Sequence, residues 1–305
     1  MEPRIVFMGS PEFALPTLKA LAANFNVVGL VTQTDRPAGR GRGLKAPPVK
    51  ELALGLGLSV IQPQRLKEPE AMEHLRSWDL DLIVVAAYGQ ILRPEVLDLP
   101  LYGCLNVHAS LLPRWRGAAP IHAAILHGDT QTGITIMKMD PGLDTGPILS
   151  TTPIPISPED TTGSLSPRLA KLGANSLLQT IPGYLAGDIK PEPQNETLVT
   201  YAPMIKKGEA ELDFNQSAKS LERRVRAFNP WPCAYTTWGG KLLKVHRAHT
   251  VHGPVVEPGK TIVHDGLPAY GTGEGILVLD ELQPAGKKAM PAQVFLRGAR
   301  NWVED

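Results

Sequence analysis

The sequence has little cysteine and no long apolar run. Only Cys104 and Cys233 occur in 305 residues. So few cysteines argue against a disulfide framework or a cysteine-rich zinc site, and they indicate a reducing compartment such as the cytoplasm. Apolar runs such as LIVVAA at 82–87 are much shorter than the roughly 20 residues that span a membrane. We therefore expect no membrane partner.

Excess charge of either sign is also missing. Lysine and arginine number 31 and aspartate and glutamate 30, a formal charge of +1. This balance excludes a global attraction to nucleic acid, so any polyanion site must be a local cluster. The first residues, MEPRIVFMGS, lack the basic start and long apolar region expected of a signal peptide. The hydrophobic share of 43% is typical of a globular chain with one large or two ordinary domains.

Short β-rich runs alternate with helical patterns in the first half of the chain. A helix is expected at 12–23, and strands are expected at 4–8, 27–31, 82–87, 104–108 and 134–139. Strands that alternate with helices predict right-handed βαβ units and a mostly parallel sheet. Ligands of such sheets bind beyond the carboxyl ends of the strands, so the site is expected at that edge.

The pattern changes after a long helix expected at 161–185. The polar, proline-bearing stretch 188–206 has no helical period and is expected to be an extended linker. A basic amphipathic helix at 216–228 is followed by short strands and glycine turns, which predict a small β-barrel. We therefore expect an N-terminal domain at 1–187 and a C-terminal domain at 207–305.

An amide and an imidazole lie on one face of the predicted strand at 104–108. Alternation along a strand places Asn106 and His108 on the same side, at the end where ligands bind. The next expected strand, 134–139, leads into the glycine-rich loop MDPGLDTG, which contains Asp140 and Asp144. In a parallel sheet this loop can close over the same edge. The sequence therefore predicts that an amide, an imidazole and a carboxylate converge.

This set suits acyl transfer from an amide-like donor to an amine. Asn106 can donate to an oxyanion as a carbonyl becomes tetrahedral. His108 can carry a proton or supply positive charge, and the carboxylate of Asp144 would orient the ring. If the amine attacks directly, the reaction needs no serine or cysteine nucleophile.

Other interpretations of these residues stay open. Ser110 and Cys104 are alternative nucleophiles, although Ser110 lacks the G-x-S-x-G setting and Cys104 begins the strand. His108 could instead be a core histidine with satisfied hydrogen bonds. A metal site would use His108 with His122, His127 and Asp144, but that histidine spacing fits no common zinc motif.

Basic residues gather in three places. Residues 35–50 contain one anion and a local charge of +4 from five cations, which are Arg36, Arg40, Arg42, Lys45 and Lys50. Glycines alternate with these cations, so the stretch reads as a flexible basic arm suited to phosphates or an RNA groove. The other two clusters are Arg223, Arg224 and Arg226 on the helix at 216–228, and Lys287 with Lys288 on a glycine turn. For the arm and the glycine turn, a solvated surface is the alternative.

The motifs together resemble those of the folate-dependent formyltransferases, across nearly the whole chain and in the family's order. The matching stretches are VFMGSPEFALPTL, TQTDRPAGRG, AAYGQIL, NVHASLLPRWRGAAPI, TGITIMKMDPGLDTGPIL, ETLVTYAPMI, RAFNPWP and LQPAGKKAM. RPAGRG, FNPWP and QPAGKKAM are typical of the branch that formylates methionyl-tRNA. Ala109 and Pro141 depart from the family's pattern, which usually has glycine at the first position and glutamate or another residue at the second.

The resemblance implies a fold and a reaction. It implies a Rossmann-like catalytic domain and an OB-like barrel that binds tRNA. The donor would be 10-formyltetrahydrofolate and the acceptor methionyl initiator tRNA. Apart from the resemblance, we expect a cytoplasmic monomer that uses no metal. A formyltransferase for small amines would not explain the basic stretch or the barrel. A folate- or RNA-binding module without catalysis would not explain the convergent set.

The resemblance also assigns roles residue by residue. The catalytic residues would be Asn106, His108 and Asp144. The folate-binding residues would be Ser110, Leu111, Leu112, Pro113, Ala87, Tyr88, Gly89 and Asp140. The tRNA-binding residues would be Arg36, Arg40, Arg42, Lys45, Arg223, Arg224, Lys287 and Lys288.

Overall fold

The computed structural model describes residues 2–38 and 43–303, and the chain forms two compact units. The first holds the described residues up to Pro120 together with Gln131–Pro155 and Ser166–Pro203. The second holds Ile121–Thr130, Ile156–Leu165 and the described residues from Met204 onward. No helix in the described part of the chain is long and apolar enough to cross a membrane.

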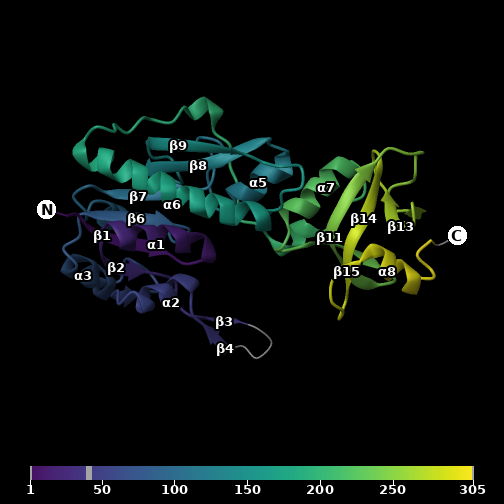
Figure 1. The fold of residues 1–305 in the computed structure, drawn as a ribbon, viewed down its shortest axis with the longest axis horizontal. Coiled ribbons are helices and arrows are strands. Elements are labelled where there is room, and N and C mark those ends of the chain that lie inside the picture. Colours follow the sequence, from purple (N-terminus) through teal and green to yellow (C-terminus); the bar gives the residue numbers. More distant parts are fainter. Residues whose placement is uncertain (1, 39–42, 304–305) are drawn as a thin grey trace. The chain divides into compact units, whose positions relative to one another are not determined.

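The first unit is built on a seven-stranded sheet of order β5-β2-β1-β6-β7-β8-β9 (Figure 1). Its strands are β1 (Arg4–Gly9), β2 (Asn26–Val31), β5 (Val60–Ile61), β6 (Leu82–Ala86), β7 (Cys104–His108), β8 (Gln131–Lys138) and β9 (Ile148–Pro155). The five strands from β5 to β7 are parallel, and β8 and β9 are each antiparallel to the preceding strand. The expected mostly parallel α/β sheet is confirmed.

The direction of β8 differs from the expectation. β8 pairs antiparallel with β7, so that Lys138 lies opposite Leu105 and Thr135 lies opposite His108. The loop after β8 therefore leaves the sheet beside the start of β7, and not at the carboxyl edge of a parallel neighbour. The apolar run at 134–139 predicts a buried strand but contains no information about its direction.

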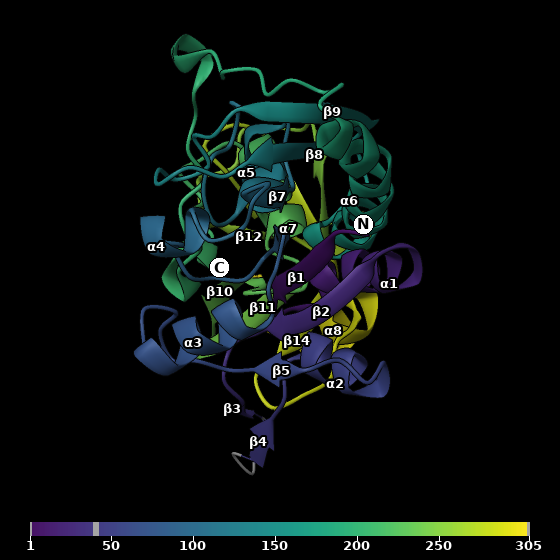
Figure 2. The same cartoon turned by 90° about the vertical axis from the view of Figure 1, so that its left-hand side faces the viewer.

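Helices cover both faces of this sheet (Figure 2). They are η1 (Glu12–Ala14), α1 (Leu15–Asn24), α2 (Pro48–Gly55), α3 (Pro69–Ser77), α4 (Pro94–Leu97) and α6 (Thr162–Ala186), with η2 (Glu196–Leu198) after α6. Gly173 of α6 lies against Val107, where a Cβ atom would come within 2.6 Å of the valine. Since side chains alternate along a strand, Asn106 and His108 point to the other face of β7.

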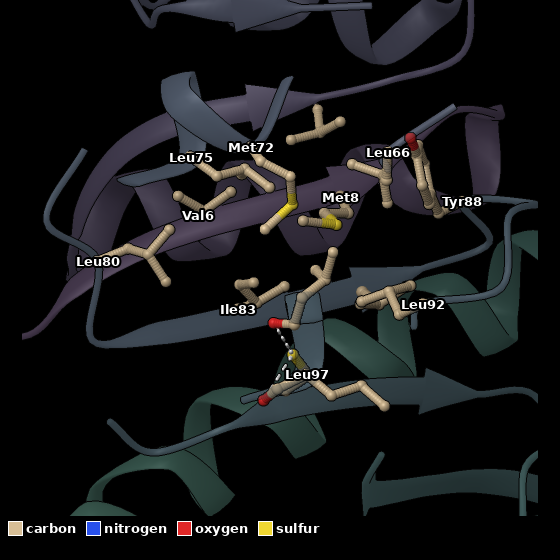
Figure 3. Packing of buried hydrophobic residues seen from close by; sticks show 14 of the residues in the cluster. Val6, Met8, Leu66, Met72, Leu75, Leu80, Ile83, Tyr88, Leu92 and Leu97 are labelled. Carbon is tan, nitrogen blue, oxygen red and sulfur yellow. Dashed lines mark hydrogen bonds between the residues drawn. The ribbon is translucent and has the colours of Figure 1, made fainter. Parts of the chain in front are cut away.

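The core of the first unit joins that other face of the sheet to α3 and α4. Met8 of β1 and Ile83 of β6 belong to one buried cluster with Met72 and Leu75 of α3 (Figure 3). Removing each such side chain from water contributes roughly 1.5–3 kcal/mol. Cys104 lies in the same cluster, and its Sγ is 3.9 Å from the carbonyl oxygens of both Val96 and Leu97. This packing fixes the strand that carries the catalytic candidates.

The described ends of the basic stretch form a small hairpin. β3 (Arg36–Ala38) pairs antiparallel with β4 (Gly43–Lys45), with Arg36 opposite Lys45. The sequence indicates a flexible arm here but no strands, and the structure pairs these six residues as two short strands. Arg40 and Arg42 lie outside the described residues.

The second unit contains a six-stranded antiparallel sheet of order β10-β11-β14-β13-β12, with β15 paired to β14. The strands are β10 (Ala234–Trp238), β11 (Lys241–Val251), β12 (Thr261–His264), β13 (Leu267–Gly271), β14 (Ile276–Pro284) and β15 (Met290–Pro291). The helices are α5 (Pro120–His127), of which all but Pro120 belong to this unit, η3 (Lys207–Ala210), α7 (Ala218–Ala227) and α8 (Ala292–Gly298). Trp302 is buried among Trp238, Tyr270 and Phe295. The sequence predicts a small β-barrel here, and the structure confirms a β domain built on an antiparallel sheet.

The polar stretch after α6 is part of the first unit as far as Pro203. Glu192 forms a β-bridge with Ile148, and Tyr201 forms one with Arg116. Gln194 is 8% exposed, which is unusual for a glutamine in a polar, proline-bearing segment. This part of the expected linker therefore packs on the sheet domain and reaches the residues described next.

Candidate active site

The three residues expected to act in catalysis meet in the first unit. The Nδ2 of Asn106 donates to Oδ1 of Asp144 at 3.2 Å, and Nδ1 of His108 lies 3.6 Å from Oδ2. Asn106 and His108 are 9% and 5% exposed. The structure therefore brings the predicted amide, imidazole and carboxylate together.

Asp144 reaches the site because the loop after β8 folds back along β7. Its backbone has φ of +52°, in the left-handed region that costs energy for a residue other than glycine. At Gly146 a Cβ atom would come within 1.9 Å of the carbonyl oxygen of Lys138, so only glycine fits this close approach. Asp140 closes the loop, because its Oδ1 accepts from the N–H of Gly142 at 3.1 Å and from Oγ1 of Thr145 at 2.5 Å.

The tautomer of His108 follows from its partner. Nε2 of the ring lies 3.0 Å from the carbonyl oxygen of Trp115. A carbonyl oxygen can only accept, so Nε2 carries the hydrogen of this bond. Nδ1 is then the nitrogen of the neutral ring that can take up a proton, and it faces the carboxylate of Asp144.

Residues 115–117 supply backbone groups to this site. The N–H of Gly117 donates to Oδ2 of Asp144 at 2.9 Å, and the carbonyl of Trp115 holds His108. Gly117 has φ of +118°, and a Cβ atom here would come within 2.7 Å of the carbonyl oxygen of Ala202. Neither residue was among the predicted site residues. The only sequence signal for them is the glycine in PRWRG.

The predicted folate-binding turn 110–113 is held by buried hydrogen bonds. Oγ of Ser110 donates to the carbonyl of Arg114 at 2.6 Å. Oγ1 of Thr135 donates to the carbonyl of Ser110 at 2.7 Å and accepts from the N–H of Leu112 at 3.1 Å. Ser110 and Thr135 are fully buried. In this geometry the Ser110 hydroxyl shapes the turn, and Thr135 is a second residue for which the sequence contains no signal.

The second predicted folate segment, 87–89, follows β6 directly. Ala87 and Gly89 both have positive φ, of 49° and 84°, so the chain turns sharply here. The carbonyl of Tyr88 accepts from Nε2 of Gln33 at 3.1 Å and lies 3.4 Å from Oγ of Ser10. The Tyr88 hydroxyl is buried and has no hydrogen-bond partner among the described residues, and burial raises its pKa.

A cavity of about 440 Å³ opens beside the residues that follow this segment. Its apolar walls include Leu66, Met72 and Val96, and Gln90 and Ile91 also line it. Among the described residues that line this cavity, Glu95 is the one carboxylate, and the cations are Arg65, Lys67, Arg76 and Arg93. These cations are dispersed along the sequence, so no motif marks them. The arrangement suits a flat apolar group that carries anions.

The described cations of the basic stretch are exposed, except for Lys50, which forms an ion pair. Arg36 on β3 and Lys45 on β4 are open to solvent. Nζ of Lys50 lies 2.8 Å from a carboxylate oxygen of Asp35, so this cation is neutralised locally. Hydrogen bonds from Gln62 and Lys50 lower the pKa of Asp35. Among the described residues of the stretch, the accessible positive charge therefore comes from Arg36 and Lys45.

The two pairs of predicted tRNA-binding residues in the second unit differ in whether they are packed or exposed. On α7, Arg223 lies across Gly128, and Nη1 of Arg224 donates to the carbonyl of Glu209. Arg224 therefore holds another part of its own unit, and Arg223 lies against one. Lys287 and Lys288 stand exposed on the turn between β14 and β15. Their accessible charge makes them the better placed of the two pairs for contact with phosphates.

The alternative site chemistries find less support. No group of three or more possible metal ligands occurs within residues 2–38 and 43–303. Both cysteines are free and buried. Burial raises the pKa of the Cys104 thiol to about 12, so at neutral pH it is a protonated thiol and a poor nucleophile.

Comparisons with known families match both units. Residues 3–181 match the family model described as "Formyl transferase". Residues 204–300 match the model described as "Formyl transferase, C-terminal domain". The two matched segments follow each other along the chain and together cover most of it.

Individual proteins match over nearly the full length. The methionyl-tRNA formyltransferase of Myxococcus xanthus is 53% identical over 298 residues, which cover 97% of this chain and 95% of that protein. The enzyme of the same name from Methylococcus capsulatus is 50% identical over 295 residues, which cover 96% of each chain. The solved structure of a methionyl-tRNA formyltransferase from Clostridium thermocellum has a TM-score of 0.57 at 16% identity and covers 92% of this chain and 98% of its own, which supports the fold.

Proposed function

This chain belongs to the methionyl-tRNA formyltransferases, and from that premise we propose how its residues carry the reaction. The enzyme transfers a formyl group to the free amino group of methionyl initiator tRNA, giving N-formylmethionyl-tRNA for translation initiation. The observation that carries our proposal is the convergence of Asn106, His108 and Asp144, with Asp144 within 3.6 Å of both partners. These three residues would act on the reacting atoms.

The proposed role of each of the three residues follows from its hydrogen-bonding capacity. As the amine attacks the formyl carbon, negative charge develops on the formyl oxygen, and Asn106 would stabilise it with an N–H of its amide. The attacking nitrogen must lose a proton. Asp144 and Nδ1 of His108 would take it, since Nε2 already donates to the carbonyl of Trp115. The same pair would return the proton to the departing nitrogen of the donor.

The formyl donor would be 10-formyltetrahydrofolate, which supplies an electrophilic formyl carbon and a nitrogen leaving group. The cavity of about 440 Å³ fits such a molecule, because apolar walls suit its rings and the four cations suit its carboxylates. The turn 110–113 and the segment 87–89 would border the same site. One solved structure of similar fold is titled HypX from Aquifex aeolicus in complex with tetrahydrofolic acid, with a TM-score of 0.64 at 18% identity, covering 100% of this chain and 49% of its own.

The tRNA would be bound by local positive charge, since the net charge is only +1. Arg36, Lys45, Lys287 and Lys288 are exposed and would contact phosphates. Arg40 and Arg42 are proposed on the resemblance alone, and Arg223 and Arg224 are proposed as weaker contacts. We further propose a metal-independent monomer that works in the cytoplasm.

Direct assay tests this function. The protein is incubated with 10-formyltetrahydrofolate and, in separate reactions, with methionyl initiator tRNA, free methionine and amino sugars. We expect formylation of the aminoacyl-tRNA, with no comparable formylation of the small amines. Formylation of small amines without formylation of the tRNA would refute the proposal and favour the small-amine formyltransferase. Folate or RNA binding without transfer would favour a binding module.

A further inference from the structure

Gln194 connects the stretch after α6 to the backbone of the Asp144 loop. Its Nε2 donates to the carbonyl oxygens of Asp144 at 2.8 Å and Gly146 at 2.7 Å. Its Oε1 accepts from Nε and Nη2 of Arg116 at 3.0 and 2.8 Å. An amide has two hydrogens to donate and two lone pairs to accept with, so every one of these positions is used. A flipped amide would face like groups on both sides, and its orientation is therefore fixed.

Arg116 holds the other end of this connection. Its side chain is 1% exposed, and Glu196 pairs with it through contacts of 2.7 and 3.1 Å. The backbone of Arg116 is also held, because its N–H donates to Thr200 and its carbonyl accepts from Ala202. A buried charge is very unfavourable unless it is paired, so the guanidinium cannot easily leave this position. Gln194 is thus attached to a rigid point of the first unit.

Asp144 needs support because of its backbone conformation. Its φ of +52° lies in the left-handed region, which a non-glycine residue keeps only where its surroundings hold it. Gly117 holds the carboxylate through its N–H, while Gln194 holds the carbonyl of the same residue. The two contacts act on different groups of Asp144. Of these two contacts, that of Gln194 is the one that restrains the loop backbone, at residues 144 and 146.

We propose that Gln194 is a positioning residue for the formyl transfer step and acts through Asp144, with Arg116 as its anchor. This inference rests on the proposed function. Gln194 is nearly buried, and both polar atoms of its side chain bond to protein groups, so the substrates do not meet this side chain. Its loss should therefore slow the chemical step and leave substrate binding unchanged. A small misplacement of a catalytic group can cost about 100-fold in rate.

The first experiment tests the donor and acceptor atoms of the Gln194 amide separately. Gln194→Ala removes both atoms. Gln194→Glu keeps an acceptor for Arg116 but places a carboxylate oxygen, in place of the donor, against the two carbonyls. We expect both variants to lower the single-turnover rate of methionyl-tRNA formylation by roughly 10- to 100-fold, with the Kd for tRNA within about twofold. Asn195→Ala is the matched control, because the Asn195 side chain is exposed and its hydrogen bonds to described residues stay within its own turn, at Thr197. That variant should react at the wild-type rate.

The second experiment asks whether Gln194 acts through Asp144. In a chain that already carries Asp144→Ala, adding Gln194→Ala should lower the rate no further, whereas a general loss of structure would lower it again. The proposal would be overturned if Gln194→Ala lowered the rate by the same factor in the wild-type chain and in the Asp144→Ala chain. A Gln194→Ala rate within twofold of the wild type would also overturn it. If Gln194→Ala fails to fold, Gln194→Glu carries the same test. A wild-type chain that formylates no methionyl-tRNA would refute the proposed function instead.

Discussion

At the scale of single residues, the site depends on side chains that backbone groups already hold by hydrogen bonds. The carbonyl of Trp115 holds one nitrogen of His108, and the N–H of Gly117 holds one oxygen of Asp144. These bonds leave Nδ1 of His108 facing the carboxylate. Preorganised groups of this kind lower a barrier because they need no rearrangement during the reaction. The motif NVH predicts which side chains take part, but it contains no information about these backbone partners.

The role of Cys104 gives a prediction at this scale. Cys104→Ala should leave the formylation rate within about twofold, because burial keeps the thiol protonated at neutral pH. It should lower the free energy of unfolding by roughly 1–2 kcal/mol, since the thiol fills part of the core beneath α4. Single-turnover rates and urea unfolding measure the two effects. A rate loss above tenfold with normal tRNA binding would instead identify Cys104 as a nucleophile.

His122 should make the second unit sensitive to mild acid. Its partial burial lowers the pKa of the ring below the ordinary value, and a hydrogen bond to the Trp231 backbone opposes this only in part. The neutral ring is thus favoured in the folded chain, and its contribution to stability is complete above about pH 6.5. That contribution is lost as the pH falls from 6.5 through the lower folded pKa. Urea midpoints at pH 7.5 and 5.5 should differ less for His122→Gln than for the wild type, and an equal difference would contradict this.

At the scale of elements, the strands could be predicted well and their directions less well. Cys104–His108 is a strand over the predicted residues, and the runs at 4–8, 27–31 and 82–87 fall within a residue of the observed strands. The sequence does not predict the reversal of β8, because an apolar run looks the same in either direction. The convergence with Asp144 was nevertheless predicted correctly, although the loop reaches the site by a different path.

Gly117 gives a prediction at this scale. Gly117→Ala should lower the free energy of unfolding by roughly 2 kcal/mol or more, since φ is +118° and the new Cβ would meet the carbonyl of Ala202. The formylation rate should fall as well, because the N–H that holds Asp144 moves. Gly55→Ala is the control, since nothing lies within 4 Å of a Cβ atom there. Equal unfolding midpoints for the two variants would show that the strain at Gly117 is unimportant.

At the scale of the whole molecule, the function draws on segments that are far apart in the sequence. Asp144 lies 50 residues before Gln194 and 38 residues after Asn106. Asn106 nevertheless contacts the carboxylate of Asp144, and Gln194 contacts its backbone carbonyl. Sequence motifs predict the amide, imidazole and carboxylate that converge, and they predict a β domain after the α/β domain. They do not predict Gln194, Thr135 or the dispersed cations of the cavity, because the contacts of these residues form only in the tertiary structure.

The charge distribution gives a prediction for the whole chain. The double variant Lys287→Ala, Lys288→Ala should weaken tRNA binding and reduce the slope of log K against log salt by about 1 to 2. Each lysine that contacts a phosphate releases counterions on binding, so its removal lowers the salt dependence. Lys19→Ala, an exposed lysine on α1, serves as the control. An unchanged slope for the double variant would exclude both lysines from the tRNA interface.

The most direct test of the account is the single-turnover rate of Asn106→Ala with 10-formyltetrahydrofolate and methionyl initiator tRNA. Loss of the amide removes the donor to the developing oxyanion while the tRNA contacts stay in place. The rate should fall roughly 100- to 1,000-fold, with the Kd for tRNA unchanged within about twofold. A near-normal rate in this variant would contradict the proposal that Asn106, together with His108 and Asp144, performs the formyl transfer.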